Sequence, residues 1–150
     1  MKIYFAASIT GGRENQGIHA LVVGELQKHG EVLTEHIADK NLTNQGEIGR
    51  SAKYIFDRDT AWIRECDTLV AEVTTTSLGV GYEIGYAESL GKPILCLYHQ
   101  TEGKVLSGMI QGNSAVETKI YTDPAETADS IILPVLSKSL IFTSTDCLIS

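Results

Sequence analysis

Short apolar runs alternate with longer segments of helical periodicity along most of the chain. Five runs have the length of buried strands and lie at residues 3–7, 32–33, 68–73, 94–98 and 119–121. Three segments carry apolar residues at a spacing of three to four and predict helices at 18–26, 51–66 and 80–90. Strands that alternate with helices form parallel sheets, so the pattern predicts an α/β fold with a five-stranded parallel sheet.

The order of these segments also predicts where a ligand would bind. Helices on both faces of such a sheet make a single doubly wound, Rossmann- or flavodoxin-like domain, which binds ligands at the carboxyl ends of its strands. The loops that follow Ala7, Leu33 and Val73 should meet at that edge. A polar loop is expected at 40–49. Asp123-Pro124 predicts the start of a last helix, which Pro134 should kink or end.

Composition narrows the class of protein. The 150 residues are 43% hydrophobic, which is enough for one core, so we expect one domain over 1–137 and a flexible tail over 138–150. A net charge of −7 without a Lys/Arg-rich run argues against binding a nucleic acid polymer. Three widely spaced cysteines, with no signal pattern and no long apolar run, predict a cytoplasmic protein, with the nucleus as a second location.

Candidate chemistry begins with exclusions. The four histidines lack the spacing of metal ligands, and the chain has no G-x-S-x-G sequence that would support a serine nucleophile. A glycine pattern after the third strand resembles a dinucleotide fingerprint, but an acid stands where a pyrophosphate would approach. We therefore expect no metal and no other cofactor.

Asp59 is the first candidate acid. It falls in the stripe Ile55, Asp59, Trp62 and Cys66, which should face the sheet, where an acid is costly unless it has a task or a partner. The alternative is that Asp59 pairs with Arg58 or Arg64, or lies at the edge of the stripe in water.

Glu83 is the second candidate acid. It follows Gly79 and Gly81, which let backbone amides approach a ligand, and is expected in the first helical turn at the carboxyl edge of the sheet. The positive helix end should keep its carboxylate ionised, as a nucleophile requires, while Asp59 in a drier setting remains an acid. The alternative is an ordinary acid that only stabilises the start of its helix.

Three blocks of sequence together resemble the 2'-deoxynucleoside 5'-phosphate N-hydrolases of the nucleoside 2-deoxyribosyltransferase superfamily. They are YFAASITGGRE at 4–14, VLTEH at 32–36 and AEVTTTSLGVGYEIG at 71–85. The resemblance implies that the enzyme cleaves 2'-deoxynucleoside 5'-monophosphates into a free base and 2-deoxyribose 5-phosphate. It implies that Glu83 is the nucleophile and forms a covalent glycosyl intermediate. Asp59 then assists the leaving base or orients the nucleophile, and Tyr4 is a phenol at the end of the first strand.

The same resemblance implies a substrate- and phosphate-binding set of Ser8, Ile9, Thr10, Gly11, Arg13, Ser77, Gly79, Ser107 and Met109. Ser107 matches a serine that the neighbouring subunit contributes, so a homodimer with shared sites is expected. Thr10 stands where better-known members have arginine, and Arg13 is expected to keep part of that positive charge.

Two other functions and one modification stay open at this point. A nucleoside 2-deoxyribosyltransferase would pass the same sugar to a second base, and a non-catalytic nucleotide-binding domain would leave its ligand unchanged. The ending Cys147-Leu148-Ile149-Ser150 matches the C-a-a-X pattern, for which a farnesyl group on Cys147 and membrane contact are the expectation. The alternative is an unmodified tail.

Overall fold

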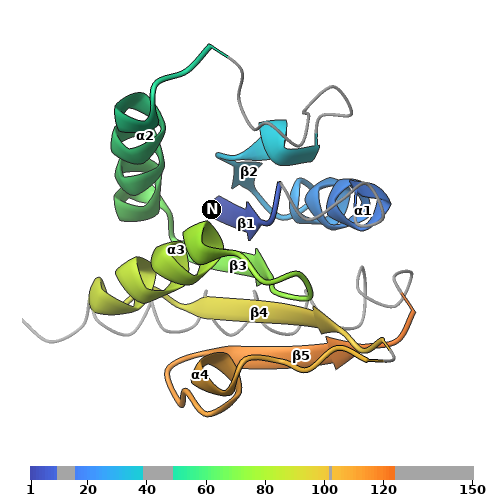
Figure 1. Cartoon of the computed structure of the whole chain (residues 1–150). Coiled ribbons are helices and arrows are strands. Elements are labelled where there is room, and N and C mark those ends of the chain that lie inside the picture. The colour runs from blue at the N-terminus through green and yellow to red at the C-terminus, as the bar shows by residue number, and fades with distance from the viewer. Residues whose placement is uncertain (10–15, 39–48, 102, 124–150) are drawn as a thin grey trace, which may run out of the picture.

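The sheet has five strands, all parallel, as the alternating pattern predicted. The computed structural model describes residues 1–9, 16–38, 49–101 and 103–123. The strands lie in the order β2-β1-β3-β4-β5 (Figure 1). Their bounds are β1 Lys2–Ala7, β2 Glu31–Val32, β3 Thr68–Glu72, β4 Ile94–His99 and β5 Glu117–Tyr121. The chain reverses its direction of travel across the sheet between β1 and β3, where doubly wound folds bind their ligands.

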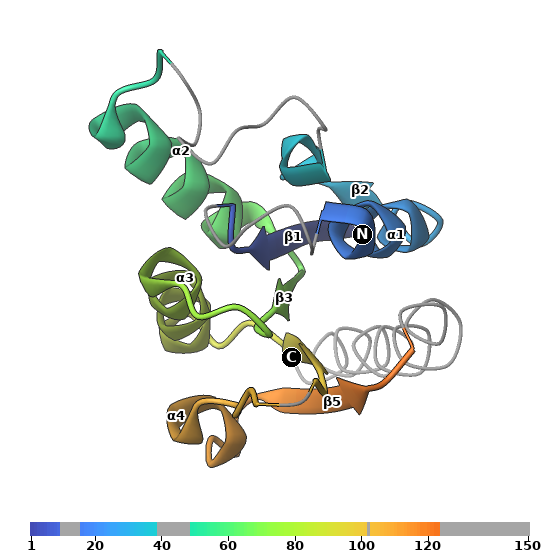
Figure 2. The same cartoon turned by 45° about the vertical axis from the view of Figure 1, so that its right-hand side comes forward.

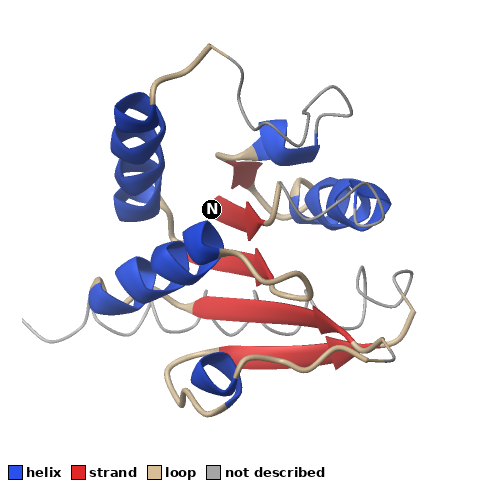
Figure 3. Cartoon of the chain, in the orientation of Figure 1, coloured by secondary structure: helices blue, strands red, loops and turns tan. Residues whose placement is uncertain are grey.

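Helices cover both faces of this sheet. One face carries α1, and the other carries α2, α3 and the short α4 (Figures 1 and 2). The short 3-10 helix η2 follows β2 beside α1 (Figure 3). The bounds are α1 Gln16–Leu26, η2 Glu35–Ala38, α2 Ala52–Glu65, α3 Leu78–Ser89 and α4 Gly108–Gln111. Neither η2 nor α4 was predicted, and the last helix expected after Asp123 lies outside the described residues.

Alternation along β1 builds two separate cores. Ile3 and Phe5 join the core beneath α1, whereas Tyr4 and Ala6 join the core beneath α2 and α3. The Tyr4 side chain is 1% exposed. Tyr4 lies in the middle of β1, so the expectation of a phenol at the end of the strand was wrong, and the phenol reaches the site from beneath the helices.

The second strand, β2, has only two residues, because beyond it the Thr34 side chain replaces the backbone of β2 as the hydrogen-bond partner of β1. Leu33 still donates its backbone N–H to Ile3, at 2.9 Å. At the next position the Thr34 hydroxyl both accepts from the Phe5 N–H (2.9 Å) and donates to the Phe5 carbonyl oxygen (2.7 Å). The backbone groups of β1 are satisfied, and the chain turns away into η2.

Serine caps set where the two site helices begin. The Ser51 hydroxyl accepts from the Tyr54 N–H (3.1 Å) at the start of α2, and the Ser77 hydroxyl accepts from the Val80 N–H (3.4 Å) at the start of α3. Helix α3 therefore begins at Leu78, two residues earlier than predicted. Glu83 lies in its second turn, and the prediction that it occupies the first turn was wrong.

A buried network holds the connection from β3 to α3. Glu72, which is 1% exposed, accepts hydrogen bonds from the backbone N–H (3.3 Å) and the hydroxyl of Thr74. The Thr74 hydroxyl in turn accepts from the His99 N–H at 2.7 Å, and the Tyr121 hydroxyl donates to Glu72 at 3.3 Å. The turn is thereby fastened to the ends of β4 and β5, which fixes the starting point of α3.

Candidate active site

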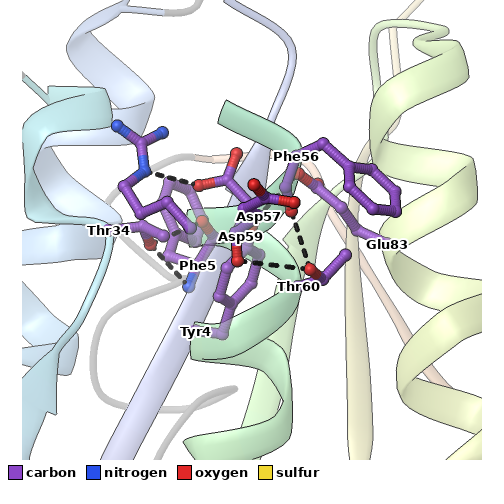
Figure 4. A network of polar contacts seen from close by, with 9 residues as sticks. Tyr4, Phe5, Thr34, Phe56, Asp57, Asp59, Thr60 and Glu83 are labelled. Carbon is purple, nitrogen blue, oxygen red and sulfur yellow. Dashed lines mark hydrogen bonds and ion pairs between the residues drawn. The ribbon is translucent and has the colours of Figure 1, made fainter. Parts of the chain in front are cut away.

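One cavity of about 230 Å³ collects the three residues expected to carry the chemistry. Tyr4 comes from β1, Asp59 from α2 and Glu83 from α3 (Figure 4). The cavity is lined by Tyr4, Ala7, Ile9, Thr34, His36, Ile37, Ile55, Arg58, Asp59, Ser77, Gly79, Val80 and Glu83. The two carboxylic acids and the phenol therefore share one cavity.

The hydroxyl of Tyr4 donates a hydrogen bond to Glu83 Oε1 at 2.8 Å. The pKa of Glu83 is raised to about 7, with burial as the largest cause. The negative charge of Asp59 also raises this pKa, whereas the Tyr4 hydrogen bond and the positive charge of Arg58 lower it. Burial and the charges of Glu83 and Asp59 raise the pKa of Tyr4, so the phenol stays protonated and remains a donor. The helix end was expected from the sequence to keep Glu83 ionised; Glu83 lies beyond the first turn, where that dipole mainly acts, and burial is the largest influence on its pKa.

Asp59 has the partner that the sequence offered as an alternative. Arg58 Nε donates to Asp59 Oδ1 at 2.8 Å, and the two side chains are 14% and 18% exposed. Arg64, the other alternative, donates instead to the Tyr86 hydroxyl at 2.8 Å. Burial is thus the main influence on Glu83, whereas Asp59 forms an ion pair with Arg58.

The predicted phosphate ligands are only partly brought together among the described residues. Ile9, Ser77 and Gly79 line the cavity. Ser8 is 5% exposed, its hydroxyl has no hydrogen-bond partner among the described residues, and it is not part of the cavity lining. Thr10, Gly11 and Arg13, like the proposed lipidation site Cys147, lie outside the described residues.

Ser107 and Met109 lie elsewhere in the chain. They line a second cavity of about 250 Å³ on the far side of α3, which shares Ser77 and Val80 with the first. Ser107 is the N-cap of α4 but its side chain makes no capping hydrogen bond, and Met109 is 84% exposed. Neither residue lines the cavity that holds Glu83 of its own chain.

Three polar residues that line the cavity were missed by the sequence reasoning as site residues. Thr34 and His36 lie in the VLTEH block, directly after the second strand, and that position was the signal that could have placed them at the carboxyl edge. Arg58 was considered only as a partner of Asp59. The His36 ring lies 5.8 Å from the Trp62 ring, so η2 and α2 meet at the cavity wall.

Two further searches cover the described part of the chain alone. Among those residues no group of three or more His, Cys, Asp or Glu side chains is arranged to hold a metal ion. In the same residues no helix combines the length and the apolar character needed to span a membrane.

Comparison with known proteins places this geometry in a family. The model of the nucleoside 2-deoxyribosyltransferase family matches residues 3–119. A mouse protein named 5-hydroxymethyl-dUMP N-hydrolase is 52% identical over 111 residues, which are 73% of this chain and 64% of the mouse protein. A zebrafish protein of the same name is 50% identical over 115 residues, which are 77% of this chain and 80% of that protein. The chain thus covers slightly less than two thirds of the mouse protein's length.

A solved structure supports the fold independently. The CMP N-glycosidase of Clostridium botulinum superimposes with a TM-score of 0.60 at 24% identity, over 87% of this chain and 98% of the other. At that identity the likeness concerns the fold alone. The family assignment rests on the matched model and on the relatives at about 50% identity, which confirm the resemblance seen in the three sequence blocks. This chain belongs to the nucleoside 2-deoxyribosyltransferase family and, within it, to the 2'-deoxynucleoside 5'-phosphate N-hydrolases.

Proposed function

We propose that the protein hydrolyses the N-glycosidic bond of 2'-deoxynucleoside 5'-monophosphates, releasing a free base and 2-deoxyribose 5-phosphate. The observation that carries the proposal is the Tyr4–Glu83 hydrogen bond in a cavity that also holds Asp59. The relatives named 5-hydroxymethyl-dUMP N-hydrolase make that modified nucleotide a substrate to test for this chain.

The reaction begins at Glu83. Its carboxylate attacks the anomeric carbon, the bond between that carbon and the base nitrogen breaks, and the base leaves with the electron pair and takes up a proton. Water then attacks the anomeric carbon of the glycosyl ester, which regenerates Glu83 and releases 2-deoxyribose 5-phosphate. The Tyr4 hydroxyl stabilises the carboxylate before attack and after release, because it donates to Oε1.

Asp59 had two roles open to it, as an acid for the leaving base or as a group that orients the nucleophile. Its hydrogen bond from Arg58 supports the second role, since the guanidinium fixes the position of the Asp59 carboxylate in the cavity. The base would then take its proton from water or from another group at the cavity.

The start of α3 is suited to a phosphate. The Ser77 oxygen accepts from the Val80 N–H, which leaves the hydroxyl hydrogen of Ser77 able to donate to a phosphate oxygen. The N–H groups of Leu78 and Gly79 belong to the first turn, where no carbonyl of the helix itself can accept from them. Ser77 and Gly79 line the cavity that holds Glu83, so a 5'-phosphate bound there would place the sugar beside the carboxylate.

A homodimer with shared sites is part of the proposal. Ser107 and Met109 line the second cavity rather than the one with their own Glu83, which supports their contributing to a neighbour's site. Exposed apolar side chains surround that cavity, with Val105 at 91% and Met109 at 84% exposed. Such a surface is typical of an interface between subunits.

We also propose a cytoplasmic location, with the nucleus as a second one. Cys66 and Cys96 are buried free thiols, which suits a reducing compartment. Fractionation of the source cells should recover the protein in the cytosolic or nuclear fraction, and recovery from a secreted fraction would contradict this location.

Base release provides the direct test. We expect free base from 2'-deoxynucleoside 5'-monophosphates, including 5-hydroxymethyl-dUMP, and none from the unphosphorylated deoxynucleosides. Glu83→Ala should lower kcat at least about 1,000-fold, since it removes the nucleophile, while Glu117→Ala, which removes a surface acid paired with Lys119, should leave kcat unchanged. Chromatography of the products measures both. Binding of the nucleotides without any base release would contradict the proposal.

The pH dependence should follow the pKa of Glu83. The attacking form is the carboxylate, so kcat/KM should rise as the pH passes through about 7 and level off above it. Tyr4→Phe removes a hydrogen bond that lowers this pKa, so the rise should move to higher pH. Tyr98→Phe is the matched control, because the buried Tyr98 hydroxyl has no hydrogen-bond partner among the described residues. Identical profiles for Tyr4→Phe and the wild type would refute this assignment.

Sedimentation tests the shared site. The wild type should sediment at twice the mass of one chain. Met109→Arg should shift the protein toward the single-chain mass and lower kcat/KM about tenfold or more, because Ser107 then leaves the neighbouring site. Leu21→Arg changes an exposed apolar residue of α1, on the opposite face of the sheet, and should alter neither property. A wild type of single-chain mass with full activity would rule out the dimer.

A further inference from the structure

Arg58 is the one Lys or Arg among the described residues that line the cavity. It comes from α2, one residue before Asp59, and the cavity also holds the second carboxylic acid, Glu83. Two acids in one partly buried space repel each other when both are charged. The position of Arg58 beside Asp59 and Glu83 is therefore expected to affect how readily the two acids ionise.

The contact between Arg58 and Asp59 is not an ordinary surface ion pair. Neighbouring residues of a helix point about 100° apart, so their side chains do not normally face each other. Here Arg58 Nε nevertheless donates to Asp59 Oδ1 at 2.8 Å, and the Arg58 side chain is only 14% exposed. The side chain must bend back across the helix surface to make this bond.

Aromatic rings one turn away on either side hold the guanidinium in that position. Its central carbon lies 4.7 Å from the centre of the Trp62 ring and 5.7 Å from that of Tyr54. Both distances are within the range of cation–π attraction, which is stronger where water is excluded. Trp62 itself packs against the core beneath α2 and α3. The guanidinium is thereby anchored to the folded core.

We infer that Arg58 is a positioning residue, held by Tyr54 and Trp62, that orients the Asp59 carboxylate and offsets its negative charge beside Glu83. The inference rests on the proposed function, in which Glu83 attacks as a carboxylate. Arg58 acts through Asp59 and through its charge.

The charges around Glu83 make the consequence measurable. The titratable side chains that line the described cavity beside Glu83 are Tyr4 from β1, His36 from η2, and Arg58 and Asp59 from α2. The negative charge of Asp59 raises the pKa of Glu83 and the positive charge of Arg58 lowers it. Removing the guanidinium takes away the one Lys or Arg charge that opposes the repulsion between the two acids among the described lining residues, so Glu83 should take up its proton at higher pH.

The experiment compares Arg58→Met with Arg64→Met, which removes the same charge from the same helix at an arginine bonded to Tyr86 rather than to an acid of the cavity. Arg58→Met should lower kcat about tenfold or more with a smaller change in KM, and should move the rise of kcat/KM to higher pH. Arg58→Lys, which keeps the charge but not the planar guanidinium, should keep the wild-type pH profile while kcat falls. Arg64→Met should match the wild type in both properties.

Two further measurements connect the effect to its cause. In an Asp59→Asn background, Arg58→Met should lower the high-pH plateau of kcat less than about twofold, because Glu83 is fully ionised there and the group that Arg58 positions is gone. Titration of the Glu83 carboxyl carbon by NMR in the free protein should show a higher midpoint in Arg58→Met, whether or not base is released. An Arg58→Met variant that equals Arg64→Met in kcat, pH profile and titration midpoint would overturn the inference. A wild type without base release would instead refute the proposed function.

Discussion

The hydrogen bond from Tyr4 to Glu83 is the contact on which the site depends. It joins the first strand to the third helix, at the place where the topology of the sheet reverses. A carboxyl group this buried is easily protonated, and the phenol is the neighbour that most favours its charged form. Because Tyr4 is 1% exposed and lies opposite Leu69 of β3 in the sheet, its hydroxyl has little freedom to move away.

The electrostatics of the cavity depend on the difference in setting of its two acids. Burial is the main influence on the pKa of Glu83, which lies near 7. Asp59 lines the same cavity and accepts a hydrogen bond from the Arg58 guanidinium. A carboxyl group whose pKa is close to neutral responds strongly to each nearby charge, so Tyr4, Asp59 and Arg58 all affect the fraction of Glu83 that is ionised and available for the proposed attack. The ionisation of Glu83 therefore depends on all of these neighbours together and not on one acid–base pair.

Helix α3 connects this cavity to the second one. Its buried side rests on the sheet through Val80, Ile84 and Ala87, its N-terminal residues Ser77 and Gly79 line the first cavity, and its outer side lines the second. The turn before it is fastened by Glu72 and Thr74 to the ends of β4 and β5. One helix thus carries the proposed nucleophile, the groups suited to a phosphate and the surface proposed to meet a neighbouring subunit.

The alternation of apolar runs was enough to predict the five parallel strands and the three main helices, because the repeat of a buried strand or an amphipathic helix is a local property of the chain. The blocks around Tyr4 and Glu83 were enough to predict the family. Local patterns did not reveal that Thr34 ends the second strand or that Arg58 and His36 reach the cavity, since each depends on a partner far along the chain or on another element. The early start of α3 at Ser77 is by contrast a local cap, made to the Val80 N–H three residues on. The pKa of Glu83 was likewise decided by tertiary structure alone, because its burial and the field of Asp59 arise only when β1, α2 and α3 pack together.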